Sequence, residues 1–136
     1  MKHLMTAGVL ASFGLAGCAA YGGAPLLTLP IDVAPSRNAS VSTPDAIQTA
    51  TGTRFHGSVC RRAPWNAPTR IRIERIGQDG TVVGVASRPI SGLSGRGSRC
   101  AFYDVLTDWT IAARERVRVC AGRSDAPCQS ATLPRS

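Results

Sequence analysis

Short stretches of the sequence alternate apolar and polar residues, and this pattern restricts the fold more than any other feature. Residues 69–76, TRIRIERI, alternate isoleucine with charged side chains, and residues 115–121, ERVRVCA, alternate valine with arginine or cysteine. A period of two is typical of a strand with one buried and one solvated face. These two stretches are therefore predicted to be half-buried β-strands.

Further stretches complete a set of short strands. Residues 78–80, QDG, form a hairpin turn, and residues 81–87, TVVGVAS, supply a β-branched partner for the strand before it. Residues 55–62 and 100–111 add strands rich in aromatic and β-branched residues. The predicted fold is therefore all-β, a small antiparallel sandwich or partly open barrel of about five to seven strands over residues 54–136.

The first residues of the chain have the pattern of a secretory signal. Lys2 and His3 give a short basic start, and residues 4–17 are an apolar run without a charged side chain. This run is shorter than the roughly 20 apolar residues that a membrane-spanning helix needs. It fits the apolar region of a secretory signal. It leads directly into the four residues Leu15-Ala16-Gly17-Cys18.

The sequence LAGC resembles the lipobox of bacterial lipoproteins at every position. The resemblance implies that residues 1–17 are a signal peptide and that the thiol of Cys18 receives a diacylglyceryl group. It also implies acylation of the new amino terminus, and several acyl chains make a stable anchor. Ala19 follows the cysteine, and the absence of aspartate there resembles lipoproteins of the outer membrane. The implied location is the cell envelope, with the domain facing the periplasm.

Four further cysteines, Cys60, Cys100, Cys120 and Cys128, lie in or beside the predicted strands. Disulfides commonly stabilise small domains in an oxidising compartment. Since Cys120 and Cys128 flank a short turn-like stretch, we expect them to form one disulfide and Cys60 to join Cys100. The alternative is a metal site that uses His56 and Cys60. It lacks a C-x₂-C pair and needs reduced thiols, so no metal and no cofactor are expected.

Residues 18–53 are predicted to be the lipidated cysteine and a flexible linker. The stretch is rich in Ala, Pro, Ser, Thr and Gly and shows no sustained period. Fully extended, it would reach on the order of 115 Å from the membrane. One part, residues 26–33, LLTLPIDV, is apolar enough to lie on a sheet edge.

The cations of the chain are almost all arginines. The formal charge is +8, and Lys2 is the only lysine. A GC-rich genome explains this bias, and recognition of phosphate or carboxylate by guanidinium groups is the functional alternative. Nucleic acid is not expected as a partner outside the cytoplasm. The candidate anion-binding face consists of Arg70, Arg72, Arg116 and Arg118, and the alternative is a solvated face neutralised by Glu74 and Glu115.

No catalytic set stands out in the sequence. His56 is the only histidine after the signal, and nothing marks it as a base. Asp104 and Asp108 would lie about 13 Å apart on one strand, too far for a pair of catalytic carboxylates. Trp65 and Trp109 are expected as core or corner residues rather than ligand platforms. An enzyme is therefore not expected.

Two functions agree with these features. The first is a structural or interaction module of an envelope or secretion assembly, held by its lipid anchor and contacting an envelope protein. The second is a module that binds an anionic envelope ligand, such as lipopolysaccharide or a wall polymer, or that inhibits a wall-cutting enzyme. The first follows from the anchor and the missing catalytic set, and the second from the arginines.

Overall fold

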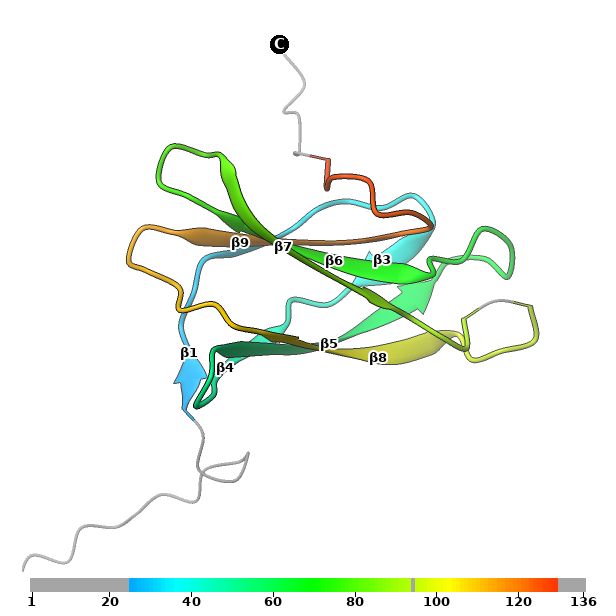
Figure 1. Cartoon of the computed structure of the whole chain (residues 1–136). Coiled ribbons are helices and arrows are strands. Elements are labelled where there is room, and N and C mark those ends of the chain that lie inside the picture. The colour runs from blue at the N-terminus through cyan, green and yellow to red at the C-terminus, as the bar shows by residue number, and fades with distance from the viewer. Residues whose placement is uncertain (1–24, 94, 130–136) are drawn as a thin grey trace, which may run out of the picture.

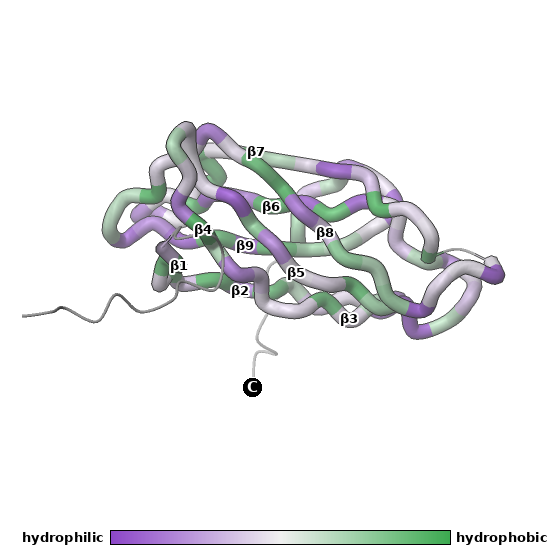
Figure 2. The backbone as a smooth tube through the Cα atoms, turned by 90° about the horizontal axis from the view of Figure 1, so that it is seen from below, coloured by the Kyte–Doolittle hydropathy of each residue, from purple (hydrophilic) through white to green (hydrophobic). Residues whose placement is uncertain are grey.

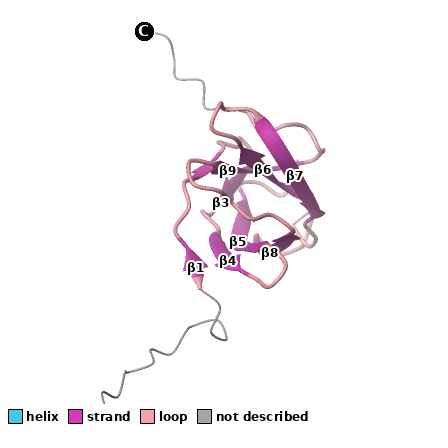
Figure 3. Cartoon of the chain, turned by 60° about the vertical axis from the view of Figure 1, so that its left-hand side comes forward, coloured by secondary structure: helices cyan, strands magenta, loops and turns pink. Residues whose placement is uncertain are grey.

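The computed structural model describes residues 25–93 and 95–129, and these contain nine β-strands and no helix (Figures 1 and 3). The strands form two sheets that pack face to face and do not close into a barrel. The described part of the chain holds no helix long and apolar enough to cross a membrane. The expected signal peptide and Cys18 lie outside the described residues. The all-β prediction is confirmed.

Sheet A is built around the longest strand of the fold, β5. This strand pairs with β3 and β4 along one edge and with β8 along the other, and every pair is antiparallel. The strand β1 extends the sheet beyond β4. The members of sheet A are β1 (Leu26–Leu27), β3 (Ala39–Val41), β4 (Asp45–Gln48), β5 (Thr53–Arg61) and β8 (Cys100–Thr107).

Sheet B has the order β2-β9-β6-β7. The hairpin expected from TRIRIERI and TVVGVAS is confirmed as the antiparallel pair β6 and β7. One pair departs from the expected antiparallel arrangement, because β2 runs parallel to β9. The members of sheet B are β2 (Ile31–Val33), β6 (Arg70–Ile76), β7 (Val82–Pro89) and β9 (Arg116–Gly122).

The core fills the space between the two sheets. Phe55 and Val105 face it from sheet A, Ile73 and Val119 face it from sheet B, and all four are fully buried. Each such side chain contributes roughly 1.5 to 3 kcal/mol relative to an exposed position. Hydrophobic and hydrophilic residues alternate along the strands (Figure 2). The period-two pattern in the sequence therefore identified the inward faces correctly.

The prediction of a flexible linker over residues 18–53 is wrong from residue 26 onward. Residues 26–48 form β1, β2, β3 and β4, so the folded domain begins near residue 26 rather than residue 54. The edge position expected for LLTLPIDV is confirmed, since β1 and β2 are the outer strands of their sheets. These four strands also raise the count above the five to seven expected. Each has only two to four residues, too few to show an alternating pattern.

Tyr103 is the titratable group of the core. Its ring lies against Gly57 on the opposite strand, where an added Cβ would come within 2.4 Å of the hydroxyl oxygen. The hydroxyl donates a hydrogen bond to the carbonyl oxygen of Ser42 (3.1 Å). Burial raises the pKa of Tyr103 well above its ordinary value. The folded protein therefore keeps a proton that the unfolded chain releases above about pH 10.

We expect the free energy of unfolding to fall by about 1.4 kcal/mol for each pH unit above about pH 10. Below that pH, Tyr103 is protonated in both states and contributes no dependence on pH. Lysine does not obscure this range, because the single lysine lies in the expected signal peptide. Urea unfolding of wild type and Tyr103→Phe between pH 9 and pH 11 measures the effect. An equal decline in both proteins would contradict it.

Candidate functional site

The two disulfides have the predicted pairing. Cys60 joins Cys100 between directly opposite positions of β5 and β8, and Cys120 joins Cys128 across the end of β9. The second disulfide holds the C-terminal segment 123–129 against the outer face of sheet B. Local spacing was enough to predict this pairing, because the turn-like stretch between Cys120 and Cys128 keeps both sulfurs near one strand.

The structure brings the four arginines of the candidate anion-binding face together on the outer face of sheet B. Their strands β6 and β9 are neighbours in antiparallel register. Each guanidinium lies beside a carboxylate of this chain. The ion pairs are Arg70 with Asp125 (2.6 Å), Arg72 with Glu74 (2.8 Å), Arg116 with Asp32 (2.7 Å) and Arg118 with Glu74 (3.6 Å).

The alternative of a face neutralised by Glu74 and Glu115 is confirmed for Glu74, which lies beside Arg72 and Arg118, but is wrong for Glu115. Glu74 is fully buried, because the C-terminal segment covers it and the backbone N–H of Cys128 donates a hydrogen bond to its Oε1 (2.9 Å). Glu115 pairs with Arg75 instead, and the hydrogen bond from Arg75 lowers the pKa of the Glu115 carboxyl group. Carboxylates of the same chain thus form ion pairs with the four arginines of the candidate anion-binding face.

A second group of arginines gathers at one end of the sandwich, where loops 62–69 and 90–99 lie (Figure 1). We call this group the basic end. The members of the basic end are Arg37, Arg61, Arg62, Arg96, Arg99 and Arg123.

Backbone contacts hold the segments of the basic end together. The backbone N–H of Arg61 donates to the carbonyl oxygen of Arg99 (2.8 Å), and that of Arg62 donates to the carbonyl oxygen of Asn38 (3.0 Å), the residue after Arg37. These bonds place the crossover before β3 beside the end of β5 and the start of β8. The strand pairing therefore positions three of the arginine-bearing segments side by side.

Side chains of the basic end also bind loop oxygens. The guanidinium of Arg61 donates to the carbonyl oxygens of Gly95 (2.8 Å) and Gly97 (3.0 Å), which fixes the loop that carries Arg96. Arg123 donates to the side-chain oxygen of Asn66 (3.1 Å). All these acceptors are neutral, so the bonds orient the guanidinium groups without cancelling their charge.

Among residues 25–93 and 95–129, no arginine of the basic end lies within 4.0 Å of a carboxylate oxygen. The acidic side chains lie elsewhere or are paired. Asp125, the nearest in sequence, accepts hydrogen bonds from Ser87 and Arg70, and these bonds lower its pKa. The positive charge of the chain is therefore least compensated at this end.

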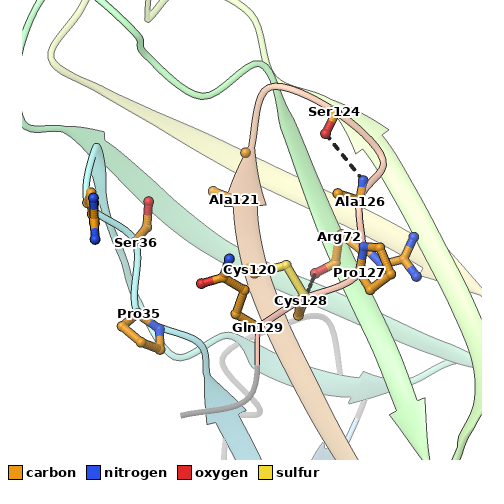
Figure 4. A pocket seen from close by; sticks show the side chains of 12 residues that line it. Pro35, Ser36, Arg72, Cys120, Ala121, Ser124, Ala126, Pro127, Cys128 and Gln129 are labelled. Atoms are coloured by element: carbon orange, nitrogen blue, oxygen red, sulfur yellow. Dashed lines mark hydrogen bonds between the residues drawn. A yellow bond between two sulfur atoms is a disulfide. The ribbon is translucent and has the colours of Figure 1, made fainter. Parts of the chain in front are cut away.

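A groove of about 530 Å³ opens beside the basic end, between residues 35–37 and the C-terminal segment. Figure 4 shows Pro35 and Ser36 on one side of it, Ser124 and Ala126 on the other, and the Cys120–Cys128 disulfide between them. The groove exists because the chain leaves sheet B after β2 and crosses to sheet A, while β9 continues. The charged residues in its lining are Arg37 and Arg72, and since Arg72 pairs with Glu74, the uncompensated charge of the groove comes from Arg37.

The other residues considered as functional occupy separate places. His56 stacks against the exposed Phe102 on the outer face of sheet A (ring centroids 6.0 Å apart). Asp104 pairs with Arg54, whose hydrogen bond lowers the pKa of this carboxyl group. The described residues contain no group of three or more His, Cys, Asp or Glu side chains suited to a metal ion.

The two tryptophans lie in different environments. Trp109 packs edge-on against Phe55 of the core, as expected (ring centroids 6.2 Å apart). Trp65 lies in the loop after β5 and is 72% exposed, so a core position is wrong for it. Its place in loop 62–69 puts an aromatic ring at the basic end.

One signal in the sequence pointed to the basic end. The expected Cys60–Cys100 disulfide already places Arg61 and Arg62 beside Arg99. The contributions of Arg37 and Arg123 depend on the crossover before β3 and on the C-terminal segment, which no local pattern indicates. Searches of protein-family models, curated proteins and solved structures find no match to this chain.

Proposed function

We propose that this chain is a lipoprotein of the cell envelope, anchored through Cys18 and oriented toward the periplasm, and that its domain binds an anionic envelope polymer at the basic end. The observation that carries the binding proposal is a cluster of six arginines without a carboxylate partner among the described residues. The lipobox sequence LAGC supports the anchor.

The chemistry of arginine favours this assignment over the face of sheet B. A guanidinium presents several donors in a plane and binds phosphate or carboxylate with two parallel hydrogen bonds. On sheet B, Asp32, Glu74 and Asp125 already lie beside these donors. At the basic end, Arg96 and Arg99 sit in a loop that Arg61 holds in place, so they are exposed and preorganised.

The triple variant Arg37→Ser/Arg96→Ser/Arg99→Ser tests the proposal. These three side chains are exposed, so we expect the fold to persist. An exposed ion pair between an arginine and the ligand contributes about 0.2 to 1 kcal/mol. The loss of three such pairs should therefore weaken binding about tenfold at low salt. Titration against lipopolysaccharide tests phosphate as the ligand group, and titration against peptidoglycan tests carboxylate. Wild-type affinity should fall steeply as salt increases.

The matched control is Arg54→Ser/Arg114→Ser/Arg116→Ser, which removes the same charge from exposed positions outside the basic end. We expect this variant to bind within about twofold of wild type, because Arg54 and Arg116 are each seven residues along a strand from the basic end, roughly 20 Å, which exceeds a Debye length of roughly 10 Å. Equal weakening by both triple variants would show a response to net charge alone and would reject the basic end as the site.

The second candidate function is the interaction module of an envelope assembly. The observation that favours it is Phe102, which is 80% exposed on β8. This strand pairs with β5 along one edge only, and an exposed aromatic on an edge strand is a common feature of protein-binding surfaces. A photo-crosslinking side chain at Phe102 should trap one defined envelope protein in living cells. If repeated experiments trap no envelope protein, this candidate function is rejected.

A further inference from the structure

We infer that the end of the sandwich opposite the basic end rests on the lipid surface. This inference depends on the proposed anchor at Cys18. We call the surface the N-terminal end and define it by the segments that meet there, residues 25–30, 49–52, 77–83 and 106–115. Figure 1 shows β1, the turn between β6 and β7, and the loop before β9 at this end.

Contacts between these segments show that they lie side by side at the N-terminal end. The backbone N–H of Gln48 donates to the carbonyl oxygen of Pro25 (3.1 Å), which places the start of the described chain beside the β4–β5 turn. An added Cβ on Gly52 would lie within 2.0 Å of the carbonyl oxygen of Thr107. A Cβ added to Gly84 would lie 3.1 Å from the ring of Trp109. The tip of the β6–β7 hairpin and the end of β8 therefore lie near the chain entry.

The length of chain before β1 brings this end to the membrane. Leu26 follows Cys18 by eight residues, which span at most roughly 28 Å when fully extended. The nine residues of β5 alone separate the two ends of the sandwich by about 30 Å. This reach is about the length of the sandwich itself, so a connection this short favours the N-terminal end, and not the basic end, against the lipid.

Exposed apolar side chains of the N-terminal end suit a lipid surface. Four large hydrophobic residues are between 45% and 55% exposed near its strand ends, namely Leu26, Val82, Val83 and Leu106. No folded segment among the described residues covers them. Apolar side chains at the headgroup boundary lose contact with water, which favours their insertion. With this end on the lipid, the basic end points into the periplasm.

The two tryptophans report separately on the two ends. Trp109 lies beside Gly84 at the N-terminal end, and Trp65 lies in loop 62–69 at the basic end. The lipidated full chain, carrying Trp65→Phe or Trp109→Phe, is reconstituted in vesicles of phosphatidylcholine brominated near the headgroup. This zwitterionic lipid does not attract the arginines. We expect bromine to quench Trp109 and to leave Trp65 unquenched.

The double substitution Val83→Asp/Leu106→Asp, made in the Trp65→Phe chain, should abolish the quenching of Trp109. Phe102→Asp is the matched control, because it places the same charge at an exposed apolar position away from the N-terminal end, and it should leave the quenching unchanged. Flotation of the vesicles measures the anchor independently. Flotation without quenching of Trp109, or with stronger quenching of Trp65, would overturn this inference alone. A chain that does not float would overturn the anchor and this inference together.

Discussion

Glu74→Ala is expected to lower the free energy of unfolding by about 3 to 5 kcal/mol, the cost of removing one partner from a buried ion pair. Glu74 is fully buried beneath the C-terminal segment. Its Oε1 accepts hydrogen bonds from Nε of Arg72 (2.8 Å) and from the backbone N–H of Cys128 (2.9 Å). Nη1 of Arg118 lies 3.6 Å from its Oε2. The substitution leaves two partly buried guanidinium groups without this carboxylate.

Asp104→Ala is the control for that measurement. Asp104 also pairs with an arginine across neighbouring strands, but Arg54 and Asp104 are both exposed, and such a pair contributes up to about 1 kcal/mol. Urea unfolding at pH 7 measures both variants. Equal losses for Glu74→Ala and Asp104→Ala would mean that water reaches Glu74, and would contradict the burial described above.

Removing the Cys60–Cys100 disulfide is expected to cost about 4 kcal/mol, and removing Cys120–Cys128 about 2.5 kcal/mol. The difference follows from the loops that they close, since the paired cysteines are 40 and 8 residues apart. A longer loop restricts the unfolded chain more strongly. Replacing both cysteines of a pair by alanine avoids a free thiol, and urea unfolding compares the two double variants. A larger loss from the Cys120–Cys128 pair would contradict this order.

The strands with a clear period were predictable from sequence, and the shortest strands were not. TRIRIERI and ERVRVCA each carry enough alternating residues to identify an inward face, and both faces are buried as expected. The strands β2, β3 and β4 are defined by pairing with β9 or β5, and β1 by pairing with β4, rather than by their own composition. A Pro- and Ser-rich stretch with few charges therefore resembled a linker although it completes both sheets.

The ion pairs of the candidate site also depend on tertiary contacts that a local sequence pattern does not reveal. Alternation placed Arg70, Arg72, Arg116 and Arg118 on one face, and the strand order brought them together there. The sequence did not indicate that Asp32 and Asp125 would arrive from distant segments to pair with two of them. It also did not indicate that residues 123–129 would cover Glu74. Both outcomes depend on where the ends of the domain cross the sheet, which only the tertiary fold determines.

Under the proposed anchor at Cys18, the short connection to β1 changes how the domain would be placed at the membrane. A 35-residue linker would have let the domain sample any orientation far from the lipid. With strands starting at Leu26, the proposed anchor would hold the sandwich close to the membrane with one end toward it. The arginines at the opposite end would then be directed toward the proposed polymers of the periplasm. The fold thus separates an apolar end from a cationic end by the length of β5.

The central claim is that the basic end, and not the face of sheet B, binds the anionic polymer. The most direct measurement follows the Nε–H signals of the arginine side chains by NMR while lipopolysaccharide fragments are added to the lipidated chain in detergent. We expect the signals of Arg37, Arg96 and Arg99 to shift at the lowest ligand concentrations, while those of Arg70 and Arg116 stay in place. Shifts confined to Arg70, Arg72, Arg116 and Arg118 would contradict the account.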